Sequence, residues 1–190
     1  IMASEDNFII HIKGQGAHAA RPHMAKDPLV IAAEIILALQ TIVSRNVDPN
    51  VPAVISCTEL HTDGIRNAIP KHVEIKGDTR SFAPEVQMQL EERMRTISEA
   101  ICAMHGATCQ FSYTHEFAPT VNWQQCVDVA VTAAINVVGA EKVDGNVAQM
   151  MISEDFGAFL QKIPGCFIFL GNGDSSDAQG NTPLHNACYD

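Results

Sequence analysis

The sequence has little of what marks several specialised protein classes. Aromatic residues make up 6% and charged residues 18% of its 190 residues, and 12 Lys and Arg are outnumbered by 22 Asp and Glu. The net charge of −10 argues against nucleic acid or an anionic membrane as a partner, because both attract a basic face. The sequence has no Cys-x-x-Cys pair, no His-Glu-x-x-His motif and no Gly-x-Ser-x-Gly elbow. These are signatures of common zinc sites and serine hydrolases.

The sequence also has no long apolar run, and its first residues are not expected to form a leader peptide. The longest nearly uninterrupted apolar run, 29–39, contains Glu34 and is too short to cross a bilayer. The first residues, Ile-Met-Ala-Ser-Glu-Asp, lack the basic start and apolar stretch of a signal peptide. Six cysteines without regular spacing indicate reduced thiols, so we expect a cytoplasmic protein. With 46% hydrophobic residues, the chain can still bury a sizeable core.

Residues 6–117 have the pattern of one α+β unit. Phe8, Ile10 and Ile12 fall at every second position, which predicts a strand. Asp27 and Pro28 supply an N-cap and a first-turn proline for a helix that runs to about residue 44. Further segments follow: strands over 53–60 and 73–80, a helix from residue 84 closed by Gly106, and a strand over 109–113. This order predicts a ferredoxin-like β-α-β-β-α-β fold with both helices on one face of an antiparallel sheet.

Residues 118–190 have a different pattern. A stripe of apolar residues predicts a helix over 123–138, and Ser-Glu-Asp at 153–155 is expected to cap a short helix that ends near Lys162. The continuous apolar run 166–170 is typical of a strand buried on both faces. Because one strand cannot make a sheet, this region predicts part of an α/β domain whose other strands lie elsewhere.

The first helix has no obvious polar side. Ten of the 11 residues in 29–39 are apolar, and a helix that is apolar all round is normally buried on more than one side. One side would cover the sheet, so we expect the other to form a homodimer interface, which Ile35→Glu should disrupt. An irregular exposed helix with several alanines is the alternative.

Three polar clusters are candidates for chemistry. They are Gly-Gln-Gly-Ala-His-Ala-Ala-Arg-Pro-His at 14–23, Asn-Ala-Ile-Pro at 67–70 with Asp-Thr-Arg at 78–80, and Pro-Leu-His-Asn at 183–186. Each has a structural alternative: a loop histidine is often only a surface residue, Asn67 suits a turn, and Arg80 could pair with a neighbouring acid.

Taken together and in order, these clusters resemble a family. The series G-x-G-x-H-A-A-x-P-H, N-x-I-P, G-D-T-R, S-E-D-F, P-G-C-F-I-F-L-G-N-G and P-L-H-N is similar to metal-dependent amidohydrolases related to aminoacylase and carboxypeptidase G. The branch with hippurate hydrolase, N-acetyl-diaminopimelate deacetylase and plant auxin-conjugate hydrolases is the most similar. The resemblance implies a ferredoxin-like lid, which also dimerises, inserted in a zinc-peptidase-like α/β catalytic domain.

The resemblance also implies roles for four residues. His18 matches a lid histidine that stabilises the oxyanion in the partner subunit's active site, and Asn67 matches a lid residue that assists substrate binding there. Arg80 is a candidate contact for the carboxylate of an N-acyl amino acid, and His185 matches the last metal ligand. The 153–155 and 171–173 segments would line the cleft. Two divalent ions, Zn or Mn, are expected in the complete enzyme.

The family's other metal ligands have no counterpart here. The N-terminal half of such enzymes carries a Cys-Gly-His-Asp type segment, a Glu-Glu pair and a further His, and one His185 cannot hold a catalytic metal alone. We therefore expect residues 6–117 to be the lid and 118–190 the C-terminal portion of the catalytic domain, inactive without the rest. The alternative is a non-catalytic dimerisation module.

Overall fold

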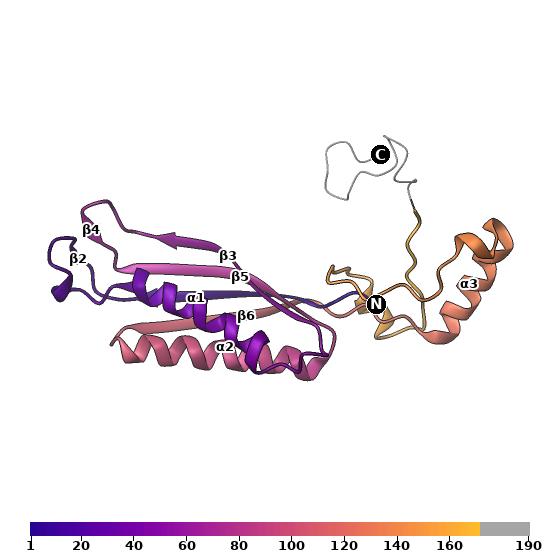
Figure 1. The fold of residues 1–190 in the computed structure, drawn as a ribbon, viewed down its shortest axis with the longest axis horizontal. Coiled ribbons are helices and arrows are strands. Elements are labelled where there is room, and N and C mark those ends of the chain that lie inside the picture. Colours follow the sequence, from indigo (N-terminus) through magenta and orange to yellow (C-terminus); the bar gives the residue numbers. More distant parts are fainter. Residues whose placement is uncertain (172–190) are drawn as a thin grey trace.

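The structure, a computed structural model, describes residues 1–171 and is built on one antiparallel sheet. The four long strands are β1 (Glu5–Lys13), β3 (Ala53–Thr62), β5 (His72–Ser81) and β6 (Thr108–Phe117). They lie in the order β3-β5-β1-β6, and the helices α1 (Pro28–Arg45) and α2 (Pro84–Met104) cover one face (Figure 1). The expected ferredoxin-like β-α-β-β-α-β order and open antiparallel sheet are confirmed.

The core lies between the sheet and the two helices. Every second residue of β1 from Phe8 to Ile12 is buried, as the alternation predicts. Gly77 lies opposite Phe8 on β5, and a Cβ at Gly77 would meet the carbonyl oxygen of Ser56 at 1.9 Å and the Phe8 ring at 2.6 Å. The glycine of the G-D-T-R motif therefore leaves the space that the Phe8 ring fills.

Helix α1 begins at the predicted cap. The Asp27 carboxylate accepts a hydrogen bond from the backbone N–H of Leu29 at 2.9 Å. The helix is long and apolar enough to cross a membrane by composition, yet Ile31, Ile35 and Leu39 are buried in the core between the sheet and the helices. Ile35 is 0% exposed, so its expected place in a dimer interface is wrong. Leu37, at 71% exposed, lies on the outer side of the helix instead.

Helix α2 ends as the sequence predicts. Leu90 and Met94 are fully buried against the sheet, and Gly106 takes a φ of +66° just beyond the helix, a conformation that favours glycine. The chain then turns into β6, which pairs with β1 at the edge of the sheet.

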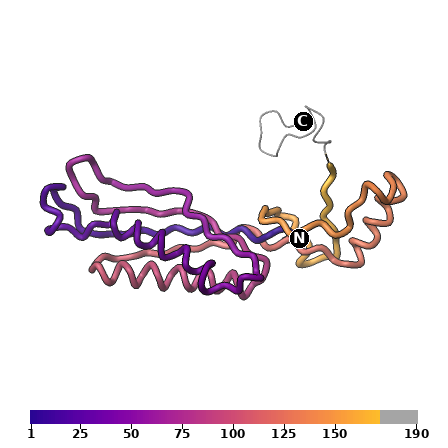
Figure 2. The backbone as a smooth tube through the Cα atoms, in the orientation of Figure 1, coloured from indigo at the N-terminus to yellow at the C-terminus, as the bar shows by residue number. Residues whose placement is uncertain are grey.

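Residues 118–171 form a smaller assembly at the opposite end from the strand pair β2 (Ala17–His18) and β4 (Ala68–Ile69) (Figure 1). Its elements are α3 (Gln124–Val138), the short 3-10 turn η2 (Ala140–Lys142) and α4 (Gly157–Leu160). A further 3-10 turn, η1 (Pro22–Met24), follows β2. The N-terminus is held beside this assembly, where Met2 and Thr120 exchange backbone hydrogen bonds of 3.0–3.1 Å (Figure 2).

Two expectations for this region are wrong. Helix α4 spans only four residues, and its N-cap is Phe156 without a side-chain hydrogen bond, so Ser153–Asp155 do not cap it. The 166–170 run forms no strand, and Leu170 is 94% exposed. An apolar run becomes a buried strand only when other strands flank it, and within the described residues none does.

Candidate functional site

Two loops meet at the end of the sheet farthest from α3 to form the tip, defined here as residues 13–27 and 63–72. A Cβ at Gly14 would lie 2.1 Å from the carbonyl oxygen of Lys26, and one at Gly16 would lie 2.8 Å from that of Ile69. Both glycines are thus required by close backbone approach. The N–H of Gly14 also donates to the carbonyl of Lys71 at 2.9 Å, which ties the first loop to the second.

The tip brings His18 and Asn67 together. Strands β2 and β4 pair antiparallel with His18 opposite Ala68, and the N–H of Ala19 donates to the carbonyl of Asn67 at 3.0 Å. Both His18 and Asn67 are exposed. Two residues that lie 49 positions apart in the sequence therefore occupy adjacent positions on one ribbon.

The imidazole of His18 has a defined orientation. Its Nδ1 accepts a hydrogen bond from the backbone N–H of Ala20 at 3.1 Å. An accepting Nδ1 carries no hydrogen, so the hydrogen of the neutral ring is on Nε2. His18 can therefore present an N–H donor to a ligand outside the loop, which is what an oxyanion requires.

Arg80 lies at the other end of β5. Its Nη1 is 3.0 Å from a Glu5 oxygen and its Nε is 2.6 Å from an Asp78 oxygen. Eight residues of extended chain separate Arg80 from His72 at the tip, which is roughly 25 Å at the usual rise per strand residue. Within one chain, the structure does not bring Arg80 to His18 and Asn67.

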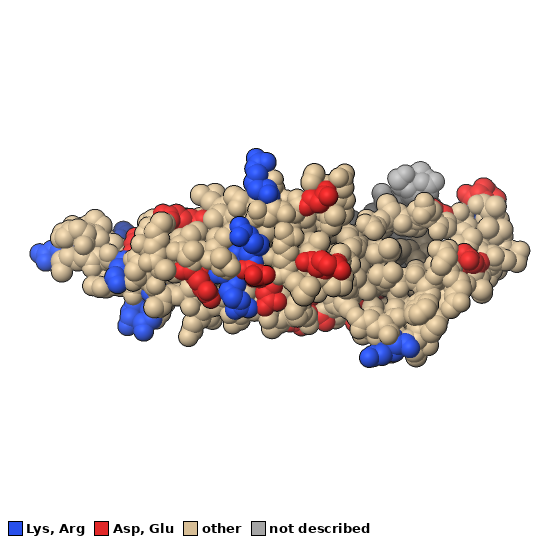
Figure 3. Space-filling model, turned by 90° about the horizontal axis from the view of Figure 1, so that it is seen from below, with Lys and Arg blue, Asp and Glu red and all other residues tan. Residues whose placement is uncertain are grey.

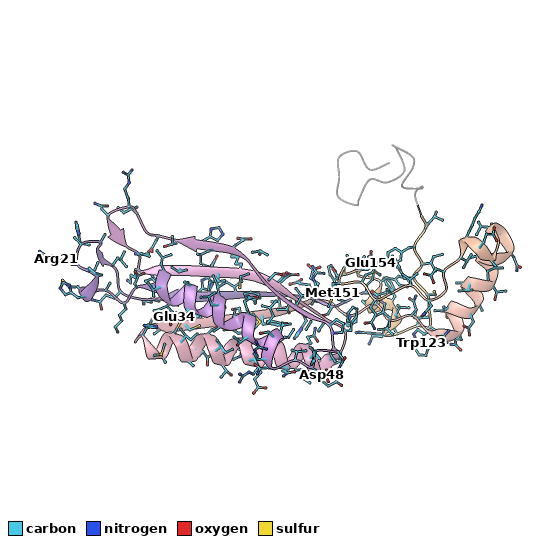
Figure 4. The ribbon with its side chains drawn as sticks, in the orientation of Figure 1. Arg21, Glu34, Asp48, Trp123, Met151 and Glu154 are labelled. Atoms are coloured by element: carbon cyan, nitrogen blue, oxygen red, sulfur yellow. The ribbon has the colours of Figure 1, made fainter. Side chains whose placement is uncertain are left out.

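A cavity of about 410 Å³ adjoins Arg80. Its walls come from the uncovered face of the sheet, including Glu5, Asp78 and Arg80, and from residues 151–153. The Ser153 hydroxyl donates to the Glu5 carboxylate, and Met151 and Glu154 lie beside this end of the sheet (Figure 4). Two carboxylates against one guanidinium give this cavity a negative balance.

The remaining predicted positions fall elsewhere. His185 and most of the 171–173 turn lie outside the described residues. Within residues 1–171, no three His, Cys, Asp or Glu side chains converge on a point where they could hold a metal ion. The residues that the structure describes therefore do not fit a catalytic metal centre.

The alternative that Arg80 pairs with a neighbouring acid is confirmed for Asp78, because residues two apart on a strand share a face. Sequence reasoning missed the second partner, Glu5, since its approach to Arg80 depends on the register of β1 with β5. Two cations beside the tip ribbon, Arg21 and Arg66, were also not singled out, although Arg66 directly precedes Asn67.

Comparison with known proteins agrees with this architecture. The sequence profile of the peptidase dimerisation domain matches residues 6–105. The chain is 33% identical to the hippurate hydrolase of Campylobacter jejuni over 189 residues, which cover 100% of the chain and 48% of that protein. It is 36% identical to the N-acetyldiaminopimelate deacetylase of Leuconostoc citreum over 190 residues, covering 98% of the chain and 46% of that protein.

A solved structure also resembles this chain, in both sequence and fold. The Bacillus subtilis YXEP protein, described as a dinuclear metal-binding peptidase of the M20 family, superposes with a TM-score of 0.67. It is 31% identical, and the match covers 87% of this chain and 40% of that one. The open sheet with its two helices is thus a peptidase dimerisation domain. The chain belongs to the M20 peptidase family and spans a little under half the length of the relatives it matches.

Proposed function

We propose that this chain is part of a metal-dependent enzyme that hydrolyses the amide bond of N-acyl amino acids, with residues 6–117 as its dimerisation lid and 118–190 in its catalytic domain. The paired placement of His18 and Asn67 on the tip carries the proposal, because these two exposed groups have no evident structural task in common. The names of the relatives, a hippurate hydrolase and a deacetylase, favour the same substrate class.

The roles follow from the chemistry of amide hydrolysis. Attack of water on an amide carbonyl places negative charge on its oxygen, and the Nε2–H of His18 is suited to donate to that oxygen. The Asn67 amide would bind the substrate beside it. Arg80 would bind the substrate carboxylate, which has to replace one of its two present partners, Glu5 or Asp78.

The metal belongs to this proposal on the strength of the dinuclear Bacillus subtilis relative. We expect two ions, Zn or Mn, with His185 as one ligand and the others supplied outside this chain. The described residues hold no such set, so this chain alone is expected to be inactive. The free thiols of Cys57, Cys102, Cys109, Cys126 and Cys166 favour the reducing environment of the cytoplasm.

The tip is proposed to act on a second copy of the chain. Strand β1 runs the length of the lid, and nine residues at about 3.3 Å each place the tip roughly 30 Å from residues 118–171 of its own chain. The outer side of α1 offers a homodimer surface, with Val30 at 51% and Leu37 at 71% exposed. A stable dimer would bury about 1,200–2,000 Å² there.

Subunit mixing in the complete enzyme tests this mechanism. His18→Ala is expected to lower kcat by roughly 10²- to 10³-fold with full metal content, the usual loss for one oxyanion donor. His185→Ala should lower metal occupancy instead. A dimer of one His18→Ala and one His185→Ala subunit should regain activity, because one site then has intact ligands and an intact His18 from the partner.

The outcomes of these assays decide whether His18 stabilises the oxyanion, whether it acts across the dimer, and whether the protein is an enzyme at all. His23→Ala, an exposed histidine on the same loop, is the matched control and should retain activity. Normal turnover by His18→Ala would remove the oxyanion role, and verified mixed dimers without activity would remove the action across the dimer. A complete protein that hydrolyses no N-acyl amino acid would favour the non-catalytic dimerisation module.

The dimer surface has its own test. Leu37→Glu places a charge on the exposed side of α1 and should convert the dimer to a monomer in light scattering at micromolar concentration. Met88→Glu, at a position 61% exposed on α2, is the control and should leave the dimer intact. A Leu37→Glu protein that stays dimeric would place the interface elsewhere.

A further inference from the structure

Charge is unevenly distributed along the chain. The tip holds five cations (Lys13, Arg21, Lys26, Arg66 and Lys71) against Asp27 and Asp63, a net charge of +3. The remaining seven Lys and Arg and 20 Asp and Glu give the rest of the chain −13. Lys and Arg side chains stand at this end of the molecule in Figure 3, and Arg21 lies at its extremity in Figure 4.

The carboxylates of the tip are already engaged by the backbone. Asp27 caps α1, as described above, and Asp63 accepts hydrogen bonds from the N–H groups of His72 and Lys71, each at 3.0 Å. The bond from His72 contributes most to lowering the pKa of Asp63, and that from Lys71 adds to it. Neither carboxylate forms an ion pair with a tip cation in the described part of the chain.

Four of the five cations have no side-chain hydrogen bond or ion pair among the described residues. The ammonium of Lys26 donates to the carbonyl of Gly106 at 2.7 Å, a hydrogen bond just beyond the C-terminal end of α2. The Lys and Arg ion pairs among residues 1–171 involve Lys76, Arg80 and Arg95. The exposed cations Lys13, Arg21, Arg66 and Lys71 are not in that set.

Two of these cations flank the proposed reacting groups. The backbone N–H of Arg21 donates to the carbonyl of His18 at 2.8 Å, which closes a turn that holds the two residues together. Arg66 is covalently adjacent to Asn67. Arg80, by contrast, is balanced by two carboxylates, so the unpaired positive charge of the lid is concentrated around His18 and Asn67.

We propose that the tip is an anion-recognition surface, in which Arg21 and Arg66 attract the carboxylate of the substrate toward His18 and Asn67. This inference rests on the proposed function and adds to it an attraction by Arg21 and Arg66 that acts on the substrate carboxylate before Arg80 binds it. Lys13 and Lys71 add to the field. A field of this kind increases the rate of association with an oppositely charged ligand and weakens as salt is added. It acts on kcat/KM and leaves the chemical step unchanged.

The experiment compares two substrates that differ in one charge. The complete enzyme and its Arg21→Gln/Arg66→Gln variant are assayed on N-benzoylglycine and on its neutral carboxamide, at 20 and 200 mM salt. For the anionic substrate, the variant should lose about threefold to tenfold in kcat/KM at low salt, with kcat retained and a flatter salt dependence. The carboxamide should be hydrolysed equally by both proteins. Arg93→Gln, an exposed cation on α2, is the control for general loss of positive charge.

Each outcome separates the two proposals. Equal hydrolysis of acid and carboxamide by the unmodified enzyme refutes tip recognition and leaves amide hydrolysis standing. A kcat/KM for the acid and a salt dependence that are unchanged in the double variant place the attraction elsewhere, with Arg80 as the remaining guanidinium, and also refute it. A similar loss on both substrates indicates a structural role and refutes it as well. Hydrolysis of neither substrate, nor of any other N-acyl amino acid, refutes the proposed function itself.

Discussion

Replacing Asp6 by Ala should destabilise the lid by about 2–4 kcal/mol, since the Asp6 carboxylate is a buried acceptor at the base of the lid, the end of the sheet nearest residues 118–171. This side chain is 1% exposed. One oxygen accepts from Gln87 Nε2 at 2.7 Å and lies 2.9 Å from His115 Nδ1, and the other accepts from the Ser4 hydroxyl at 3.1 Å. The contacts therefore join β1 to α2 and β6.

The expected magnitude follows from what each partner can do afterwards. A hydrogen bond to a charged group contributes about 1.5–3 kcal/mol, but the carboxylate also pays a desolvation cost that Ala removes. His115 is 54% exposed and regains water, and Ser4 keeps its contact with the Ser81 hydroxyl at 3.3 Å. Of the three partners, Gln87 is affected most by the loss of its hydrogen bond. The decrease in the free energy of unfolding should therefore be smaller than the summed energies of three hydrogen bonds.

Urea unfolding of the 190-residue chain measures this effect. Asp6→Asn should cost only about 1 kcal/mol, because its amide N–H₂ can donate to the Ser4 oxygen while its carbonyl still accepts from Gln87. Asn7→Ala, exposed at the next position of β1, is the control and should change stability by no more than about 0.5 kcal/mol. If Asp6→Ala unfolds at the same urea concentration as the unmodified chain, or if Asn is as harmful as Ala, the hydrogen bonds are not what stabilises this junction.

Three further outcomes are expected. Gly77→Ala should cost at least about 1–3 kcal/mol by overpacking. Gly171→Ala should be neutral in the same unfolding assay, because an added Cβ there has no atom of the described residues within 4 Å apart from its chain neighbours. The pKa of Asp63 is lowered in the folded chain, so its contribution to stability is present above the unfolded pKa and is lost as pH falls through the folded pKa. Asp63→Asn should therefore flatten the decline in stability below about pH 5. An unchanged dependence of stability on acid pH would contradict this. The dialysed chain should retain Zn or Mn no more tightly than about micromolar affinity, because residues 1–171 hold no ligand cluster, and stoichiometric metal by elemental analysis would overturn that expectation.

The lid could be predicted because its signals are local. Alternation along β1 and the four-and-three spacing of apolar residues along α2 each report which side of an element is buried. Asp27 marks a helix start through its side-chain hydrogen bond and Gly106 marks a helix end through its backbone conformation, and both effects involve neighbouring residues alone. These signals placed the long elements close to their observed bounds.

The predictions that were wrong depended on distant parts of the structure. The sequence shows that α1 is apolar all round, but only the packing shows that Ile35 faces the core and Leu37 faces outward. The run 166–170 has the composition of a buried strand, yet strand formation requires neighbours that the described residues do not supply. Likewise, the register of β1 with β5 brings Glu5 to Arg80, and nothing in either local sequence specifies that register.

The separation of the two ends of the lid explains why the proposed site needs more than one chain. Arg80 and the cavity beside residues 151–153 lie at the base, where Glu5 and Asp78 make the balance negative. His18 and Asn67 lie roughly 30 Å away, among exposed cations. A rigid four-stranded sheet cannot fold back to join these ends. A second copy with its lid reversed could instead bring a positive tip to a negative base, and such complementary charge favours that pairing over an arrangement that places two bases together. In this view, the length of β1 and the charge difference between its ends are both requirements of a site shared between subunits.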